Sequence, residues 1–527
     1  MPPIISSSDI APSFRAFVFA CLVGLAATAG RPAIVRAQAQ SVQDARTEAV
    51  RLRNAGDFRG AVAVLRPHLE RYPNDGDALR LLAETLYWLK DFAGARAVSE
   101  RALVAHPEDT DLRLQYARML IETGFAARAH EVLAPVGSPS TRGRADAILG
   151  TLAYWEGDLT NANHLLESAI ASGDTDPAIR RMHTDIAVLT APWVGVSPAY
   201  QHDDQPINRT SLGAEAGWFP VPSTSFALHA QGLRFQLGDT ATRNASEADL
   251  TLSHYAAAAH TEIEIAAGAV TRSFGASSDF TGSAALAIRL PTDIKLGIRA
   301  YRAPYFATEA SLSQAVMTST GIAYAHLDDP RGWLGEAAYQ LQRYPDSNNL
   351  TGAYVWLLAP LVHSSDLTLR AGYSGSLQTS SESRFSLVRP RQAYLPGDPR
   401  FDLTGAYQPY YTPIDLQSHS AIGAITAHLS RVTTFNANGS YAFRATETAP
   451  TLLVLTTNAP NMVQRFTYTR NFNPWKAHAS LEIQPSTDLS FVASGDIFRT
   501  GFYTASSASV ALVYRLAGRA IRMAGGY

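Results

Sequence analysis

Residues 262–269 read Glu-Ile-Glu-Ile-Ala-Ala-Gly-Ala, so apolar side chains alternate with charged or small ones. Successive side chains of a β-strand point to opposite faces, and this stretch therefore predicts a strand with one apolar and one charged face. Similar alternation returns in four later stretches, which are residues 294–301, 366–374, 435–443 and 477–483. Clusters of Gly, Pro, Asn, Asp and Ser lie between such segments and predict turns.

The connections between these segments differ strongly in length. Residues 290–293 and 484–488 are tight turns, whereas other connections are long. Short turns at one end and long loops at the other, with small or aliphatic side chains on one face, are typical of outer-membrane barrels rather than soluble sandwiches. Residues 191–527 are therefore expected to form an all-β transmembrane outer-membrane barrel of 16 to 18 antiparallel strands. Its interfacial aromatic girdle would contain Tyr301, Trp333, Tyr344, Trp356, Phe443 and Phe498.

A helical repeat precedes the strands. Ala61, Ala95, Ala129 and Ala162 follow one another at intervals of 34, 34 and 33 residues, each just after a turn that contains Gly or Asp. A small residue stands 12 positions before each of them, namely Ala49, Ala83, Ala117 and Gly150. Small residues let two helices approach closely, and this period is typical of tetratricopeptide repeats. Residues 40–190 are therefore expected to form an all-α tetratricopeptide solenoid of four units, closed by a helix near residues 177–189.

Two aromatic pairs occupy the same place in units two and four of this repeat. They are Tyr87-Trp88 and Tyr154-Trp155, one residue past a core position of the first helix. One interpretation makes them candidate groove contacts that stack on a sugar ring or hold a peptide. The other, which the sequence favours, makes them buried area packed between neighbouring helices, the usual role of aromatic residues.

The first residues resemble a secretory leader. Arg15 precedes an apolar run over residues 16–29, which is followed by Gly30, Pro32 and the small-residue sequence Ala37-Gln38-Ala39. This order predicts a signal peptide over residues 1–39. The single cysteine, Cys21, lies within it. The mature chain is therefore expected to lack a disulfide, a cysteine nucleophile and thiolate metal ligands.

The composition excludes one class of partner. The chain has 44 Lys plus Arg against 46 Asp plus Glu, which gives a formal net charge of -2. Without a positive excess, a nucleic-acid partner is not expected. The leader and the barrel together predict the bacterial outer membrane as the location, with the repeat domain in the periplasm and membrane lipid around the barrel.

The order of leader, repeats and barrel resembles that of the exopolysaccharide export porins. The segment Gly405-Ala-Tyr407-Gln-Pro409-Tyr-Tyr411 resembles a Gly/Tyr/Pro/Tyr segment in the barrel domain of the cellulose synthase C family, and the architecture is also similar to that of the poly-N-acetylglucosamine export porin. The resemblance implies a 16-stranded barrel through which a polysaccharide leaves the cell. It also implies that the repeats reach an inner-membrane glycan synthase complex, other periplasmic proteins or peptidoglycan. This chain departs from the cellulose synthase C family in having about four repeats, where that family has many more.

The long connection over residues 379–413 carries the candidate contacts with a transported polymer. These candidate pore or loop residues are Arg384, Arg389, Arg391, Tyr394, Tyr407, Tyr410 and Tyr411. The connection either folds inward, narrowing the pore and guiding sugar rings along aromatic faces, or forms an ordinary extracellular loop. Both interpretations stay open, because loops of this length are usually functional or disordered.

The charges predicted to face inward are of both signs, which favours a neutral, cellulose-like β-glycan over a strongly anionic polymer. They are Glu262, Glu264, Glu336, Asp366 and Glu482 against Lys295, Arg299 and Arg370. Two other functions remain as alternatives. One is a general porin or receptor barrel with a scaffold repeat domain, and the other is an outer-membrane lipid-modifying enzyme.

The enzyme alternative rests on two Ser/His pairs, His254 with Ser253 and His478 with Ser480. The sequence contains no Gly-x-Ser-x-Gly elbow, His-Glu-x-x-His motif, phosphate loop or dinucleotide fingerprint. A general base also needs a positioned nucleophile and an orienting partner. We therefore expect these histidines to be polar lumen or interfacial residues, and we predict no catalytic residue, cofactor or metal.

Overall fold

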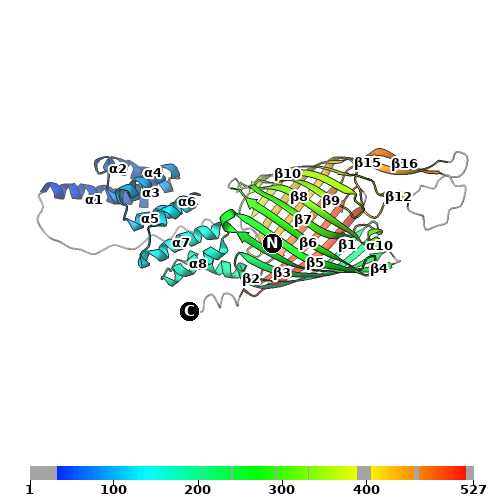
Figure 1. Cartoon of the computed structure of the whole chain (residues 1–527). Helices are drawn as coiled ribbons and strands as arrows, with labels where there is room; N and C mark the ends of the chain where they lie inside the picture. Colours follow the sequence, from blue (N-terminus) through cyan, green and yellow to red (C-terminus); the bar gives the residue numbers. More distant parts are fainter. Residues whose placement is uncertain are drawn as a thin grey trace. The chain divides into compact units, whose positions relative to one another are not determined.

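The chain forms two compact units, of which one ends at Asp185 and the other begins at Ile186 (Figure 1). The computed structural model describes residues 33–205, 207–238, 241–290, 294–329, 331–387, 405–455, 462–501 and 503–517. The predicted leader lies mostly outside these residues, and the first helix begins at Ala33. Among the described residues, no helix has the length and apolar character needed to cross a membrane.

The first unit consists of helix hairpins that match the predicted repeats. Pairing the helices in chain order gives four hairpins, each closed by a tight turn, followed by a single helix. The helices are α1 (Ala33–Asn54), α2 (Phe58–Arg71), α3 (Gly76–Trp88), α4 (Phe92–Ala105), α5 (Thr110–Glu122), α6 (Ala126–Leu133), α7 (Pro139–Trp155), α8 (Leu159–Ala171) and α9 (Pro177–Leu189).

The small residues of the repeat mark where the two helices of each hairpin meet. Four alanines, Ala61, Ala95, Ala129 and Ala162, have no exposed surface. Opposite them, a Cβ added to Gly150 would lie 2.9 Å from Leu166. Any larger side chain at these positions would push the helices apart, which is why the spacing identifies the fold.

The turns inside the hairpins also repeat. The positions at which the chain leaves each first helix all have positive φ angles, of 82° at Gly56, 62° at Lys90, 84° at Gly124 and 77° at Gly157. In the first, second and fourth hairpins an Asp side chain then caps the second helix by accepting a backbone N–H three residues ahead, as Asp57 does from Gly60 and Asp91 from Gly94, whereas Phe125 occupies this position in the third. A left-handed residue followed by an N-cap reverses the chain within a few residues.

The second unit is a closed antiparallel barrel of 16 strands, with one further strand of the same sheet outside the ring. The ring runs in chain order from β1 to β11, then through β14, β15, β17, β18 and β19, and β19 pairs with β1 to close it. The strands up to β9 are β1 (Trp193–Asp203), β2 (Ile207–Val221), β3 (Thr224–Leu237), β4 (Ala241–Ala256), β5 (Thr261–Arg272), β6 (Ser278–Arg289), β7 (Ile294–Tyr305), β8 (Val316–Asp328) and β9 (Leu334–Arg343). The later ring strands are β10 (Asn349–His363), β11 (Leu367–Ser380), β14 (Leu416–Ser430), β15 (Thr433–Leu455), β17 (Trp475–Ile483), β18 (Leu489–Arg499) and β19 (Thr504–Arg515).

The strands outside the ring extend or flank it. β15 is 23 residues long. Its first part pairs with β14 and β17, and its second part pairs with β16 (Met462–Phe472), so the two strands continue past the rim as a ribbon (Figure 1). β12 (Phe385–Leu387) and β13 (Gly405–Tyr407) form a separate two-stranded sheet.

The two ends of the barrel differ as the sequence predicts. We call the end at which β1 begins and β19 ends the terminal end, and the opposite end the loop end. At the terminal end only residues 222–223 join β2 to β3, and residues 431–432 join β14 to β15. The loop end carries the long connection between β11 and β14 and the ribbon.

The exterior of the barrel is apolar. Alternate residues along each strand face out, and the large ones among them are exposed, for example Leu212 at 62%, Ile265 at 50% and Ile298 at 59%. The other face carries charge, as shown by the hydrogen bond of 2.6 Å between Lys295 and Glu262. A ring of exposed aliphatic side chains is stable only in an apolar surrounding, and a closed barrel leaves no unpaired strand edge within it. The unit is therefore built as a transmembrane barrel of the outer-membrane kind.

Most of the predicted aromatic girdle is wrong. Phe443 and Trp333 are exposed, but Tyr344 is buried and Phe498 lines the interior. Trp356 faces inward with its ring 6.2 Å from that of His326, and Tyr301 shares the inward face of β7 with Lys295. Tyr301 has the same spacing along the strand as Lys295 and Arg299, which places it on their inward face, and Tyr344 lies past the end of β9, where alternation no longer assigns a face. The exposed aromatics of the ring strands include Tyr200, Trp218, Phe280, Tyr339, Tyr373 and Tyr441.

Candidate functional site: a tyrosine strap at the loop end of a polar lumen

The interior of the barrel has two chemically different walls. The carboxylate wall, from β2 to β9, carries Glu215, Glu247, Asp249, Glu262, Glu264, Asp279 and Glu336 among cations that include Arg209, Arg272, Arg289, Lys295 and Arg299. The hydroxyl wall, from β11 to β15, carries Ser374, Ser376, Gln378, Ser418, Ser420, Asn436, Asn438 and Ser440. The register also places Arg370 and Glu482 inward, whereas Asp366 precedes β11 in a turn.

A cavity of about 660 Å³ opens inside the loop end of the lumen. Aromatic rings surround part of it, and the hydroxyl and amide groups of the hydroxyl wall complete its lining. The rings belong to Tyr305, Tyr344, Tyr411, Phe472, Trp475, Phe498 and Tyr503. Gln340 and Gln342 of β9, with Lys476 and Arg499, add further polar groups.

Residues 405–413, which we call the tyrosine strap, contribute to this lining. Tyr410 is 1% exposed, and its ring stacks on Tyr344 at a centroid distance of 3.5 Å and an angle of 6°. Its hydroxyl donates to the carboxylate of Asp346, with distances of 2.6 and 2.7 Å to the two oxygens. The strap is therefore packed and hydrogen-bonded against the connection between β9 and β10.

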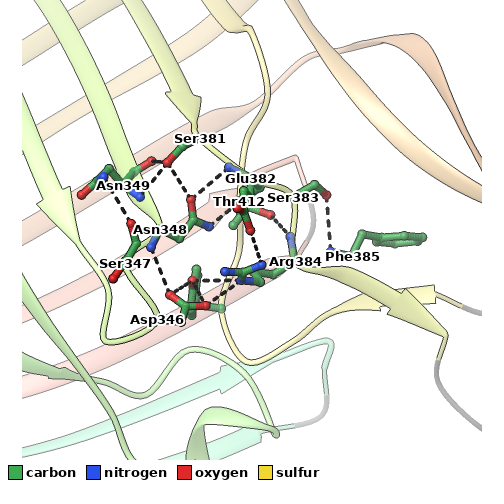
Figure 2. A network of polar contacts seen from close by, with 11 residues as sticks. Asp346, Ser347, Asn348, Asn349, Ser381, Glu382, Ser383, Arg384, Phe385 and Thr412 are labelled. Carbon is green, nitrogen blue, oxygen red and sulfur yellow. Dashed lines mark hydrogen bonds and ion pairs between the residues drawn. The ribbon is translucent and has the colours of Figure 1, made fainter.

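Arg384 and its neighbours complete this first anchor, and Figure 2 shows the network. The Nε of Arg384 donates to Asp346 Oδ2 at 2.6 Å, and its backbone N–H donates to the hydroxyl of Thr412 at 2.9 Å. Asn348 Oδ1 accepts from the Ser381 hydroxyl and the Glu382 N–H, both at 3.0 Å. Burial acts to raise the pKa of Asp346, but the hydrogen bonds from Tyr410 and Arg384 outweigh it and lower the pKa below its usual range.

A second carboxylate holds the strap from the opposite side. The Tyr411 hydroxyl donates to Glu447 Oε2 at 2.7 Å, and the Tyr407 hydroxyl lies 3.5 Å from Oε1. Arg470 of β16 donates to the same Oε1 at 2.9 Å. Glu447, in the second part of β15, is 1% exposed, so its charge is balanced by these donors rather than by water.

The end of β7 and the loop that follows it supply a third contact. The backbone N–H of Tyr411 donates to the Tyr305 hydroxyl at 3.2 Å, and the Thr308 hydroxyl donates to the carbonyl of Pro409. The strap thus connects three separate loop-end elements, which are the β7–β8 loop, the β9–β10 loop and the ribbon.

Four of the seven predicted pore or loop residues come together in this way. Arg384 and Tyr410 meet at Asp346, and Tyr407 and Tyr411 meet at Glu447. Arg389, Arg391 and Tyr394 lie outside the described residues.

Sequence reasoning missed the two carboxylates. Asp346 lies in a polar turn of no unusual pattern. Glu447 is the one charged residue of the segment 445–455, and that isolation is the signal from which it could have been found.

The two aromatic pairs of the helical unit each divide into a packed and an exposed ring. Tyr87 packs against the helical core and donates its hydroxyl to Glu122, whereas Trp88 is 55% exposed. Burial raises the pKa of Tyr154, with Asp185 nearby as a lesser cause, and Trp155 is exposed. The tyrosines therefore serve as packing, and the tryptophans are the members of each pair that a partner can reach.

In each of the two Ser/His pairs considered for catalysis, the histidine is hydrogen-bonded to a group other than its serine. His254 faces outward and its Nδ1 lies 2.9 Å from the Thr224 hydroxyl, while Ser253 faces inward. His478 and Ser480 both face inward, but the Nδ1 of His478 is turned to Asp496 Oδ1 at 3.0 Å. Within the described residues, no group of three or more His, Cys, Asp and Glu side chains is arranged to hold a metal ion.

Comparisons with known proteins agree with the repeat pattern and show distant similarity elsewhere. A family model described as tetratricopeptide repeat matches residues 76–119, which cover α3, α4 and most of α5. No curated protein matches the sequence. One similar solved structure is a bacterial polysaccharide outer membrane secretin, with 10% identity and a TM-score of 0.44 over 62% of this chain and 99% of that chain.

Two further solved structures are similar over the same share of the chain. CdiB from Acinetobacter baumannii has 9% identity and a TM-score of 0.36, covering 62% of this chain and 60% of that chain. The translocator domain of the autotransporter NalP from Neisseria meningitidis has 11% identity and a TM-score of 0.22, covering 62% of this chain and 89% of that chain.

Proposed function

We propose that the barrel exports a polysaccharide across the bacterial outer membrane, and that the polymer is an uncharged, cellulose-like β-glycan. The observation that carries this proposal is the lining of the loop-end cavity, where aromatic rings stand beside a wall of hydroxyl and amide groups. Flat rings stack on the apolar faces of pyranose rings, and hydroxyl and amide groups exchange hydrogen bonds with sugar hydroxyls. Such contacts are weak and numerous, so a chain slides past them without being trapped.

The tyrosine strap has a direct role in this proposal. Tyr411 lines the cavity. The two carboxylate anchors hold the strap at the loop-end mouth, Asp346 through Tyr410 and Glu447 through Tyr411. A polymer leaving the lumen would pass these rings last. The strap is therefore the proposed exit contact: Tyr411 faces the polymer, while Tyr407 and the buried Tyr410 hold the strap in place.

The proposed orientation follows from the two ends of the barrel. Short turns of outer-membrane barrels face the periplasm and long loops face the medium. The terminal end, where the chain enters β1, would then be periplasmic and the strap would be extracellular. The repeats would lie in the periplasm as a docking scaffold for an inner-membrane glycan synthase complex or for periplasmic proteins, as in the exopolysaccharide export porins that the sequence resembles.

The test compares polymer in the periplasm and in the medium in a strain that lacks the gene, with the sugar composition of both fractions determined. We expect polymer to accumulate or be degraded in the periplasm, and the full-length chain to restore secretion where residues 40–190 alone do not. Unchanged secretion would reject export of that polymer and favour a general porin, a receptor or an enzyme.

A matched pair of variants tests the lumen itself. Ser420 lines the cavity, and its neighbour Ala421 faces outward on the same strand. Ser420→Trp is expected to reduce secretion by narrowing the lumen, whereas Ala421→Trp adds an apolar ring to the membrane face and is expected to leave it unchanged. Equal secretion by the two variants at equal barrel levels would contradict passage through the lumen.

A further inference from the structure

Three inward histidines share an arrangement that the proposed function does not use. His229, His326 and His478 each stand directly opposite a carboxylate on the next strand, namely Asp249, Glu336 and Asp496. Their Nδ1 atoms lie 3.1, 3.3 and 3.0 Å from a carboxylate oxygen. The three pairs come from β3/β4, β8/β9 and β17/β18, so they are distributed around the ring.

The outward histidines of the same barrel are paired differently. His202 lies 2.7 Å from the Asn208 side chain, His254 lies 2.9 Å from the Thr224 hydroxyl and His419 lies 2.6 Å from the Tyr373 hydroxyl. These three inward histidines therefore face an acidic group, and the outward ones face a neutral group. At the terminal rim the register also turns His363 and His428 inward, where His363 Nδ1 lies 3.4 Å from the Thr368 hydroxyl. His428, at the terminal rim, is exposed and lies 3.1 Å from the Thr434 hydroxyl.

The charged surroundings of each inward histidine are also defined. His229 faces Glu215 of β2 through Nε2 at 3.7 Å, with Glu247 the next charged residue on β4. His326 stands opposite Lys295 of β7, which Glu262 binds at 2.6 Å, and Asp328 is two residues along β8. His478 stands opposite the neutral Asn438, and Lys476 lies 4.0 Å from Asp496.

Histidine is the side chain whose charge ordinarily changes between about pH 5 and about pH 8. A carboxylate accepts a hydrogen bond from the ring in both protonation states, so each pair stays assembled while its net charge changes from -1 to zero. In a lumen bounded by a low-dielectric wall, such changes alter the potential along the whole path.

We propose that these three histidine–carboxylate pairs make the charge of the lumen depend on pH, so that the pore selects cations in neutral medium and loses this selectivity in acidic medium. The inference rests on the proposed function only in requiring that the lumen conducts. Uptake of three protons would add up to three positive charges to a lumen in which Glu215, Glu247 and Glu264 stand against Arg209, Arg299 and Arg370.

The experiment records currents through the purified full-length protein in planar bilayers under a KCl gradient. The cation-to-anion permeability ratio is expected to fall roughly twofold or more between about pH 8 and about pH 5.5. The triple variant H229Q/H326Q/H478Q should lose most of this change, because the two inward histidines that remain, His363 and His428, lie at the terminal rim and have no carboxylate partner. The matched control H202Q/H254Q/H419Q removes three outward histidines of the same barrel and should behave as the wild type.

A second measurement needs no current, so it tests the inference even if the loop-end mouth of the barrel is closed. Trp356 faces the lumen with its ring 6.2 Å from His326. Its fluorescence, taken as the difference between wild type and W356F in detergent, should be quenched more by iodide and less by caesium as the pH falls. This change should be mostly lost in the variant that lacks the three paired histidines.

The outcomes separate the two proposals. A permeability ratio and a quenching pattern that do not change with pH, or that change equally in both triple variants, would overturn the pH dependence while leaving polysaccharide export intact. A pH-dependent ratio in a protein whose loss leaves secretion unchanged would support the pH dependence and reject export.

Discussion

Glu447 is the residue on which the strap depends most. It accepts hydrogen bonds from Tyr411 and Arg470 with its side chain fully buried. Glu447→Gln removes the charge that both donors satisfy and is expected to weaken this anchor by about 2 kcal/mol. Hydrogen exchange of residues 405–413 should therefore be faster in the variant.

The control for this change is Tyr468→Phe on the same ribbon, where the ring is half exposed. It should leave the exchange of the strap as it is in the wild type. Equal protection of the strap in E447Q and wild type would show that the Tyr410 anchor holds it alone.

Asp75 plays a comparable role in the helical unit. It caps α3 and accepts from His68 at 2.7 Å and from Arg46 Nε at 3.0 Å. Burial acts to raise the pKa of Asp75, but these hydrogen bonds and that of the Ala78 N–H outweigh it and lower the pKa. A lowered carboxyl pKa stabilises the folded state fully above the ordinary value of 3.8, and this stability is lost as the pH falls below it.

We therefore expect Asp75→Asn to lower the Tm of the helical unit at neutral pH and to reduce the fall in Tm between about pH 5 and about pH 3. Thermal melts of the full chain, followed by circular dichroism at the helical wavelength, measure the Tm at neutral pH and its change with pH. Asp77→Asn is the matched control, since Asp77 contacts Arg46 from an exposed site. An unchanged pH profile in D75N would show that other carboxylates dominate acid unfolding.

At the scale of elements, the strands show how one residue of register decides chemistry. Leu250 faces out and is exposed, whereas Thr251 faces the lumen and donates to Asp249 at 3.0 Å. Leu250→Arg is expected to cost about 2–4 kcal/mol if the position lies near the bilayer midplane. Thr251→Arg places its charge beside a carboxylate and should cost much less.

Folding into liposomes at increasing urea, followed by heat-modifiable migration in gels, measures this difference. Similar midpoints for L250R and T251R would contradict the assignment of faces on β4. The comparison matters because a shift of one residue in register exchanges the lipid face and the lumen face.

At the scale of the whole molecule, the ring closes without the ribbon. Residues 433–441 of β15 pair with β17, and β16 pairs only with the second part of β15. Replacing residues 449–468 by a short turn, which keeps Glu447 and Arg470, should therefore leave barrel assembly unchanged. Heat-modifiable migration of the deleted chain tests this, and loss of the folded band would show that the ribbon takes part in closing the barrel.

Much of the architecture could be predicted because it rests on local periods. Ala61, Ala95, Ala129 and Ala162 define the repeat, and alternation such as that of residues 262–269 defines the strands. A helix or strand must hide one face, so its sequence carries the period of its own secondary structure. The strand number, the two ends of the barrel and the four helical repeats follow from such patterns.

The candidate site could be predicted only in part. Tyr407, Tyr410 and Tyr411 were found because they cluster in one short segment, but their partners Asp346 and Glu447 were not. Tyr410 and Asp346 are 64 residues apart, and Tyr411 and Glu447 are 36 residues apart. No local period relates residues at such separations.

The amino-acid sequence by itself thus determined the kinds of element, their order and the presence of an apolar face on each strand. The tertiary structure alone decided which carboxylates hold the strap and which histidines meet an acid. The physical reason is that periodicity is a property of one element, whereas register and loop contacts arise when the ring closes and aligns strands distant in sequence.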